Sequence, residues 1–370
     1  MPSRRASPPR LALNARRASV ALLLAAPALL LAAPALLPPV VAADPAGAAT
    51  TRAAESRGPV EGREEWLLSQ NLLTLPAFSP YARGRGRTQV RLHFDWGSDF
   101  GWDQDLAGEE PGDRRYLVDG EHRTLDVDVR HGIGERVALA VRVPVRWRGG
   151  GLLDPIIDAF HRVVTTTLGL PDNGRPRFLQ SRLRILGRDE EGRPVRWTAP
   201  AGTGIGDVEL SAAWTVHRPS ETDGWTGALA GRLTLPTGRG PFESSGLAAG
   251  VQYAAARPLG GRVDVYLGAG AVAFTDRQAH GIRHAPARAH VFSALEWRPA
   301  RRLSLLVQAD GSSRLVTNLA RYPGVQSYLR IGAKVDLPQG LGLEGGFVEN
   351  LAVQDVTTDF GIFLGLSRGF

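Results

Sequence analysis

Charged side chains alternate with apolar ones in the segment 87–96, the spacing that places them on one face of a β-strand. Arg91, His93 and Asp95 share one face there, and apolar residues such as Leu92 and Phe94 share the other. Guanidinium and carboxylate groups on neighbouring strands form cross-strand ion pairs, and guanidinium groups also bind acidic solutes. The chemistry that this pattern predicts is therefore packing of a polar interior or binding of a small solute.

The same spacing returns along the chain and predicts a shared, charged interior. The candidates for the lumen and its mouth are Arg91, His93, Asp126, Asp128, Arg142, Arg146 and Arg148. Expected interior bases also include Arg130, Arg232, Arg262, Arg298, Arg330 and Lys334, with acids at Asp95, Asp207, Glu209, Asp264, Glu296, Asp310, Asp336, Glu344 and Asp359. This near balance favours ion pairs that rigidify a narrow barrel, and it gives no basis for predicting anion or cation selectivity. We expect Arg91, Arg142, Arg146 and Arg148 to converge near the outer mouth as the best cluster for an acidic solute.

Eight histidines leave a hydrolase open as an alternative. They are His93, His122, His131, His161, His217, His280, His284 and His290, and no nucleophile motif accompanies any of them. The absence of cysteine excludes a thiol nucleophile and a disulfide scaffold. We therefore predict that the protein is not an enzyme.

A short amphipathic helix is expected at residues 154–168, with Asp154 as its cap and Phe160 on its apolar side. Asp158 and His161 follow Asp154 at helical spacing, but three groups without a fourth ligand make a weak metal site. We predict no metal and no cofactor. The helix lies in a long loop, where it could act as a constriction or lid.

These residues need a scaffold, and the alternation predicts twelve strands. The expected strands are 87–96, 125–130, 137–147, 208–216, 225–235, 247–256, 263–274, 289–297, 303–310, 329–337, 341–347 and 360–370. Most have the length of a tilted membrane strand, and their connections alternate between short and long. This pattern predicts an all-β, antiparallel transmembrane barrel. Fourteen strands remain possible through a hairpin at 179–198 in the extracellular insertion 149–206.

The amino-terminal residues read as an export signal. Residues 1–43 hold five arginines and no acid, followed by an Ala/Leu-rich core and small residues at Ala42 and Ala43. Without them, the formal charge of +7 falls to an excess of two bases. The basic charge of the chain therefore does not indicate nucleic-acid binding. Residues 44–63 are expected to be a disordered linker, and residues 64–85 a periplasmic segment or plug with apolar residues from Trp66 to Phe78.

The chain ends like an outer-membrane barrel. Gly365, Leu366 and the final Phe370 resemble the carboxy-terminal signal that the barrel-assembly machinery recognises, although Arg368 departs from it. We expect a cell outer membrane location, with outer-membrane lipid, lipopolysaccharide and the assembly machinery as partners, and a small solute as a further one.

Several motifs in order resemble one family. They include Gly149 to Asp154 (GGGLLD), Gly169 to Arg175 (GLPDNGR), Gly204 to Asp207 (GIGD) and Leu235 to Gly238 (LPTG). Together they resemble the bacterial family known as domain of unknown function 3187, which looks like an outer-membrane barrel family, over residues 66–370. This chain departs from it by extra residues at about 163–168. The resemblance implies an architecture and no activity.

Together these patterns favour a narrow channel or transporter for small solutes over a plugged structural or assembly barrel. The barrel domain is expected to span residues 86–370.

Overall fold

Twelve long strands form the body of the molecule. The structure is a computed structural model that describes residues 57–64, 66–82, 84–102, 116–153, 155, 157, 159, 182–198, 200–218, 224–244, 246–351 and 356–370. The long strands are β1 (Thr88–Trp102), β2 (Tyr116–Gly132), β3 (Val137–Gly149), β7 (Val208–His217), β8 (Thr226–Leu235), β9 (Ala248–Pro258), β10 (Val263–Phe274), β13 (Ala287–Ala300), β14 (Leu303–Ser313), β15 (Val325–Asp336), β16 (Leu341–Asn350) and β17 (Thr358–Gly369).

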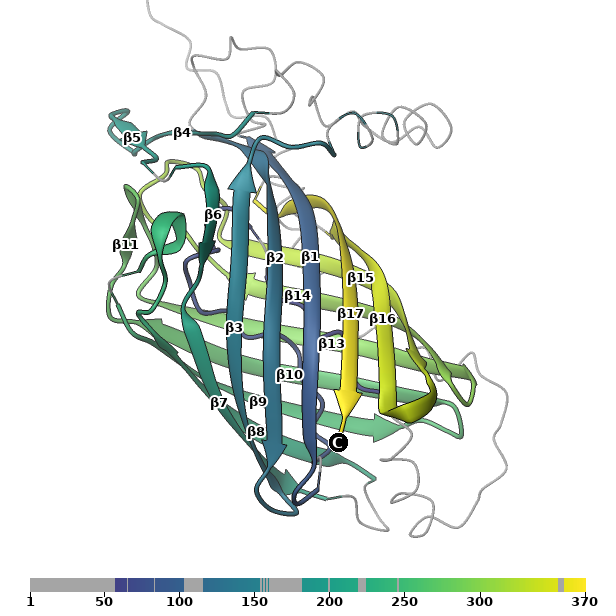
Figure 1. Cartoon of the computed structure of the whole chain (residues 1–370). Helices are drawn as coiled ribbons and strands as arrows, with labels where there is room; N and C mark the ends of the chain where they lie inside the picture. The colour runs from purple at the N-terminus through teal and green to yellow at the C-terminus, as the bar shows by residue number, and fades with distance from the viewer. Residues whose placement is uncertain are drawn as a thin grey trace, which may run out of the picture.

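The twelve strands form a closed antiparallel barrel (Figure 1). Each strand pairs with its neighbour along the chain, and β1 pairs with both β2 and β17, which closes the ring. A closed ring leaves no unpaired sheet edge. The predicted fold class and strand order are confirmed. Several strands are longer than expected; β1 and β2, for example, continue as a paired ribbon as far as Trp102 and Leu117.

The barrel has two different ends. At the short-turn end, the connections include residues 133–136, 259–262, 301–302 and 337–340, the last of which holds the 3-10 turn η6 (Pro338–Gly340). At the long-loop end, the connections include residues 150–207, 236–247 and 275–286. The C-terminus lies at the short-turn end (Figure 1).

Alternation separates the two faces of the wall. Leu92, Leu125 and Val307 are exposed on the outside, where they belong to a surface of large apolar side chains from many strands. Asp126 and Asp128, which lie between the exposed Leu125 and Val129 on β2, are buried inside. An apolar outside with an ionic inside suits a wall that lies against lipid.

The possible extra hairpin lies outside the ring. Its limbs are β4 (Arg184–Arg188) and β5 (Pro194–Arg196), and β4 pairs with the long-loop end of β2 from Tyr116 to Asp119. The short strand β6 (Gly202–Ile205) pairs with β3 beyond the point where β7 begins. The remaining short elements are the hairpin β11 (Gln278–Ala279) with β12 (Ile282–Arg283) and the 3-10 turn η5 (Gly240–Phe242). The count is therefore twelve and not fourteen.

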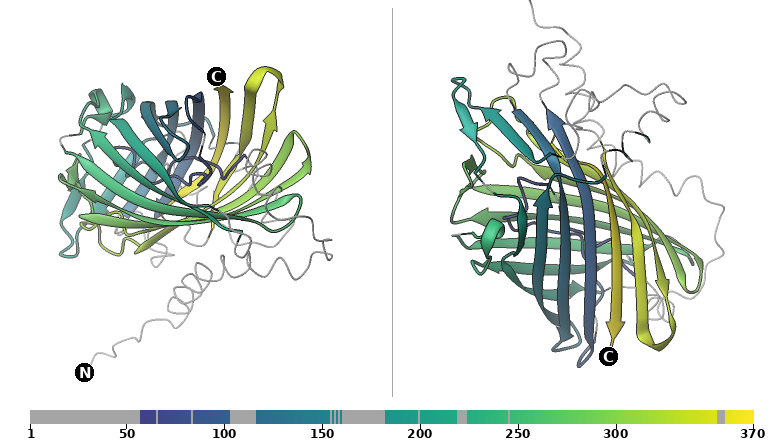
Figure 2. Two further views of the ribbon diagram at one scale, coloured as in Figure 1. Left: turned by 90° about the horizontal axis from the view of Figure 1, so that it is seen from below. Right: turned by 45° about the horizontal axis from the view of Figure 1, so that its top comes forward.

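An amino-terminal segment runs inside the barrel. We call residues 57–64 and 66–82 the lumen segment; it is the purple trace within the ring of strands in Figures 1 and 2. Val60 and Trp66 are fully buried in it. The expected disordered linker is therefore wrong for residues 57–63, because the barrel interior supplies burial and hydrogen bonds that the composition of the segment does not reveal.

The lumen segment crosses the barrel twice. It starts at the short-turn end, where the Arg57 guanidinium donates to the Arg301 carbonyl (2.6 Å). It turns at the long-loop end, where the Leu67 amide donates to Asp99 (2.8 Å). It returns to the short-turn end, where the Thr215 hydroxyl donates to the Pro80 carbonyl (2.9 Å), and then enters β1.

Two clusters of apolar side chains hold the lumen segment in place. The turn packs with long-loop residues in one cluster, whose members include Trp66, Leu67, Leu315, Leu319 and Tyr322. The returning limb packs on lumenal side chains of β8, β9, β10 and β13, in a cluster of Ala77, Phe78, Ala228, Ala230, Ala254, Ala256, Tyr266, Phe292 and Ala294. The alanines on β8, β9 and β13 leave the room that the returning limb fills.

Some expectations fall outside the described residues. These are the signal at residues 1–43, most of the linker, and the loop-helix residues Asp154, Asp158, Phe160 and His161. Leu153 and Ile157 are described and buried, and the Ile157 amide donates to the Leu153 carbonyl (2.9 Å). Within the described part of the chain, no helix is long and apolar enough to cross a membrane.

Candidate functional site

Two arginines of the wall hold a carboxylate of the lumen segment. Arg130 on β2 forms an ion pair with Glu61, and Arg91 on β1 lies 3.5 Å from the same carboxylate. Burial alone would raise the pKa of Glu61, but Arg130 and Arg91 outweigh it and hold this pKa well below its usual range. Each arginine also has a carboxylate in the wall, Asp128 for Arg130 (2.6 Å) and Glu344 for Arg91 (2.7 Å). Glu61 therefore completes an ion-pair network that begins in the wall.

A second carboxylate of the segment reaches β13. Glu64 lies 2.8 Å from the Arg288 guanidinium and 3.8 Å from His290. Between the two carboxylates, Arg63 forms a buried ion pair with Glu209 on β7. Residues 57–64 run from the short-turn end toward the long-loop end, and we call them the ascending limb. They present charges of alternating sign to opposite sides of the wall.

The wall also binds the main chain of the segment. The Lys334 ammonium donates to the carbonyl groups of residues 57, 58 and 59, with the shortest distance 2.7 Å to Pro59. The Arg330 guanidinium donates to the Arg63 carbonyl (2.6 Å). Backbone polar groups that lie away from water need such partners, so these contacts allow an extended chain to sit in the lumen.

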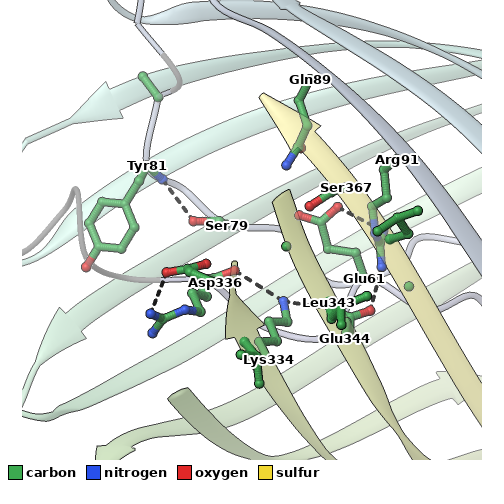
Figure 3. Close-up of a pocket in the computed structure, with 16 residues that line it drawn as sticks. Glu61, Ser79, Tyr81, Gln89, Arg91, Lys334, Asp336, Leu343, Glu344 and Ser367 are labelled. Carbon is green, nitrogen blue, oxygen red and sulfur yellow. Dashed lines mark hydrogen bonds and ion pairs between the residues drawn. The ribbon is translucent and has the colours of Figure 1, made fainter. Parts of the chain in front are cut away.

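A cavity of about 310 Å³ lies beside Glu61 at the short-turn end (Figure 3). It is bounded by the segment and by wall side chains that include Gln89, Arg91, Lys334, Asp336, Glu344 and Ser367. Lys334 and Glu344 form an ion pair there (2.9 Å). The cavity is polar and carries both signs of charge, so it fits a hydrated polar solute better than an apolar one.

A second cavity, of about 350 Å³, lies at the long-loop end. Asn71, Leu72 and Leu73 of the turn line it together with His280 and His284. The His284 ring donates from Nε2 to the Leu68 carbonyl (3.1 Å), and burial lowers the pKa of His284 to about 4. The lumen segment therefore lies between two cavities along the barrel.

The lumen candidates from the sequence mostly lie inside. Asp126, Asp128, Arg142 and Arg146 are buried, and Arg142 lies 3.2 Å from Asp128 and 3.6 Å from Asp126. His93 is buried between Asp95 (3.1 Å) and Glu344 (3.3 Å), and its ring stacks on Phe363.

The expected convergence of four arginines at the outer mouth is wrong. Arg91 lies near the short-turn end of β1, whereas Arg148 lies at the long-loop end of β3, where it donates to Asn71 (3.0 Å). The two strands begin at the same end of the barrel, so an early residue of one cannot meet a late residue of the other. Arg262 and Asp336 are also not enclosed, because both lie exposed at short turns.

Two residues at the carboxy terminus have separate roles. Gly365 faces inward, where a Cβ atom would lie 3.2 Å from Cβ of Glu344 and 3.3 Å from its carboxylate. Leu366 and Phe370 are exposed, and the main chain of Phe370 bonds to Thr88 in both directions (2.9 and 3.2 Å). Gly365 thus gives room to the charge network, and residue 370 helps to close the ring.

Sequence reasoning missed the site residues Glu61, Arg63, Glu64 and Arg288. Glu61 and Arg63 fall in a stretch without periodicity, and Arg288 lies one residue before the expected start of its strand. The alternation of β13 could have found Arg288, because it shares the face of His290.

The family model for "Protein of unknown function (DUF3187)" matches residues 40–370. The chain belongs to this family. A comparison with curated proteins gave no match.

Among solved structures, an outer membrane channel of the COG4313 type from Pseudomonas putida F1 is similar at a TM-score of 0.54 and 14% identity, covering 80% of this chain and 100% of that one. This likeness shows a shared barrel fold. The NanC porin (TM-score 0.41, 8% identity, 76% and 98% covered) and the Ralstonia pickettii toluene transporter TbuX (0.37, 11%, 78% and 90%) are more distant and carry no argument.

Proposed function

We propose that this protein is a narrow outer-membrane channel for small solutes, and that the lumen segment closes it. The observation that carries this proposal is that ion pairs and hydrogen bonds hold the ascending limb between two cavities. The ring of strands closes by its own pairing, so the segment is able to move without opening the wall. In this arrangement the short-turn end faces the periplasm.

The nature of the contacts supports a removable closure. Breaking an ion pair has a small net cost in free energy when water then solvates both charges. Exposing a packed apolar core to water has a larger cost. The ascending limb has mainly contacts of the first kind, through Glu61, Arg63 and Glu64. The fold is also one that an outer membrane channel uses.

A disulfide lock tests this function. The chain has no cysteine, so an introduced pair is the sole route to a disulfide. A Cβ atom at Gly250 on β9 would lie 2.9 Å from Cδ2 of Leu75, which suits the double variant Leu75→Cys/Gly250→Cys. Single-channel current is measured in a planar bilayer before and after reduction, with Leu75→Cys alone as the control.

We expect discrete current steps from wild type and from the reduced pair, and loss of current in the oxidised pair. Equal current in a fully oxidised pair would show that the segment does not gate the channel. Silence from folded wild type and from the reduced pair would favour the second candidate, a plugged scaffold. The apolar cluster of Trp66, Leu67 and Tyr322 over the turn is the observation that favours this alternative.

A further inference from the structure

Arg288 is a fully buried cation with unusual surroundings. Its guanidinium lies against neutral groups of the wall, with the Ser312 hydroxyl and the Gln326 side-chain carbonyl each at 2.6 Å. Its Nη1 atom has no hydrogen-bond partner among the described residues. The nearby His290 ring is also buried, and its Nε2 atom has no such partner within the described chain.

In the described part of the chain, the only ion pair of Arg288 is with Glu64 of the lumen segment. This differs from Arg91 and Arg130, which keep the wall carboxylates Glu344 and Asp128 when Glu61 leaves. A buried charge that loses its partner is strongly destabilising. Withdrawal of Glu64 would leave Arg288 without an ion pair from the described residues, so an anion that enters the open lumen would be favoured there.

We propose that Arg288, with Ser312, Gln326 and His290, is a binding site for the carboxylate of a transported solute, and that Glu64 is an internal ligand that occupies it in the closed state. The proposal rests on the proposed function and names the solute class as small organic acids. A solute carboxylate has the shape and charge of the Glu64 carboxylate that Arg288 binds in this structure. The Nε2 atom of His290 and the Nη1 atom of Arg288 are further nitrogen atoms that could bind it. Solute and segment therefore compete, and binding of the solute favours the open state.

The first test measures binding without transport. Gluconate is titrated into the folded full-length protein in detergent by calorimetry, with sorbitol as the neutral match. We expect Glu64→Gln to bind gluconate at least about tenfold more tightly than wild type, and Glu64→Gln/Arg288→Gln to lose this binding. Glu135→Gln, at an exposed carboxylate in a short turn, is the control and should match wild type.

The second test keeps the native Glu64 in case the first variants do not fold. Leu73→Cys places a single thiol at a buried position of the turn, 1% exposed in the native residue. Its labelling by a maleimide reports release of the segment. We expect gluconate to speed labelling relative to sorbitol and chloride at equal ionic strength, and the same variant with Arg288→Gln to lose this effect.

The outcomes separate the two proposals. Equal gluconate affinity in wild type and Glu64→Gln, binding that survives loss of Arg288, or labelling that gluconate does not change would each overturn the anion site. Tighter binding of inorganic phosphate than of gluconate would overturn the carboxylate assignment. The expected binding pattern in a protein that passes no current would contradict the channel function and leave the anion site standing.

Discussion

The side chain of Gln308 binds the main chain of Val60 from both directions. Its Oε1 accepts from the Val60 amide (2.8 Å), and its Nε2 donates to the Val60 carbonyl (3.1 Å), as a paired strand would do. Both residues are fully buried. One lumenal glutamine of β14 thus replaces a strand partner for a chain that passes through the barrel.

Replacement of Gln308 should loosen the ascending limb. In Gln308→Leu the Val60 amide and carbonyl lose their partners, at a cost of about 2 kcal/mol or roughly a thirtyfold change in local opening. Hydrogen exchange of peptide 57–64 measures this. Gln278→Leu, at an exposed position of the long-loop end, is the control. Unchanged exchange in Gln308→Leu would contradict the role of this pair.

The glycine-rich motif after β3 has a packing reason. A Cβ atom at Gly151 would overlap the carboxylate of Glu121, which is buried and accepts from the Trp96 indole (2.9 Å) and from the Leu153 amide. Gly151→Ala should therefore lower the free energy of unfolding by about 1–3 kcal/mol. Urea unfolding followed by tryptophan fluorescence tests this. Gly134→Ala, where no atom lies within 4 Å, is the control, and equal midpoints would refute the explanation.

Acid should favour release of the lumen segment through His284. Burial, together with the nearby charge of Arg288, lowers the pKa of His284 to about 4, whereas a free imidazole titrates near 6.5. A lowered histidine pKa favours the docked state above pH 6.5, and this advantage is lost as the pH falls toward 4. From pH 7 to pH 5 the opening constant should rise about twentyfold.

The labelling rate of Leu73→Cys at each pH measures this change, after correction for the pH dependence of the maleimide reaction. His284→Gln keeps a donor for the Leu68 carbonyl and removes the titration, so it should flatten the pH profile over this range. An equally steep profile in His284→Gln would assign the effect to other groups.

Phe370 should matter for assembly more than for stability. Its side chain is 67% exposed, while its main chain closes the ring with Thr88. Phe370→Ala keeps these main-chain bonds, so refolding in detergent should match wild type. In cells, the fraction that shows the heat-dependent gel shift of a folded barrel should fall. Leu364→Ala, also exposed on β17, is the control, and equal folded fractions in cells would remove the assembly role.

The strand faces could be predicted from the sequence because alternation is a local property. Leu125, Asp126, Val127 and Asp128 occupy opposite sides of β2 whatever the rest of the chain does. The interior charges followed from the same rule. The position of charges along the barrel also depends on strand direction, which is why the grouping of Arg91 with Arg148 was wrong.

The sequence by itself determined twelve alternating strands, an ionic interior and a closed ring, since local periodicity and connection length carry that information. Only the tertiary structure decided that residues 57–82 fill the lumen. Glu64 and Arg288 are 224 positions apart, and Val60 and Gln308 are 248 apart. Neither pair shares a period or a motif. Their contacts exist because the closed barrel encloses polar groups away from bulk water. The amino-terminal segment of the same chain supplies the hydrogen-bond and ion-pair partners that these groups need.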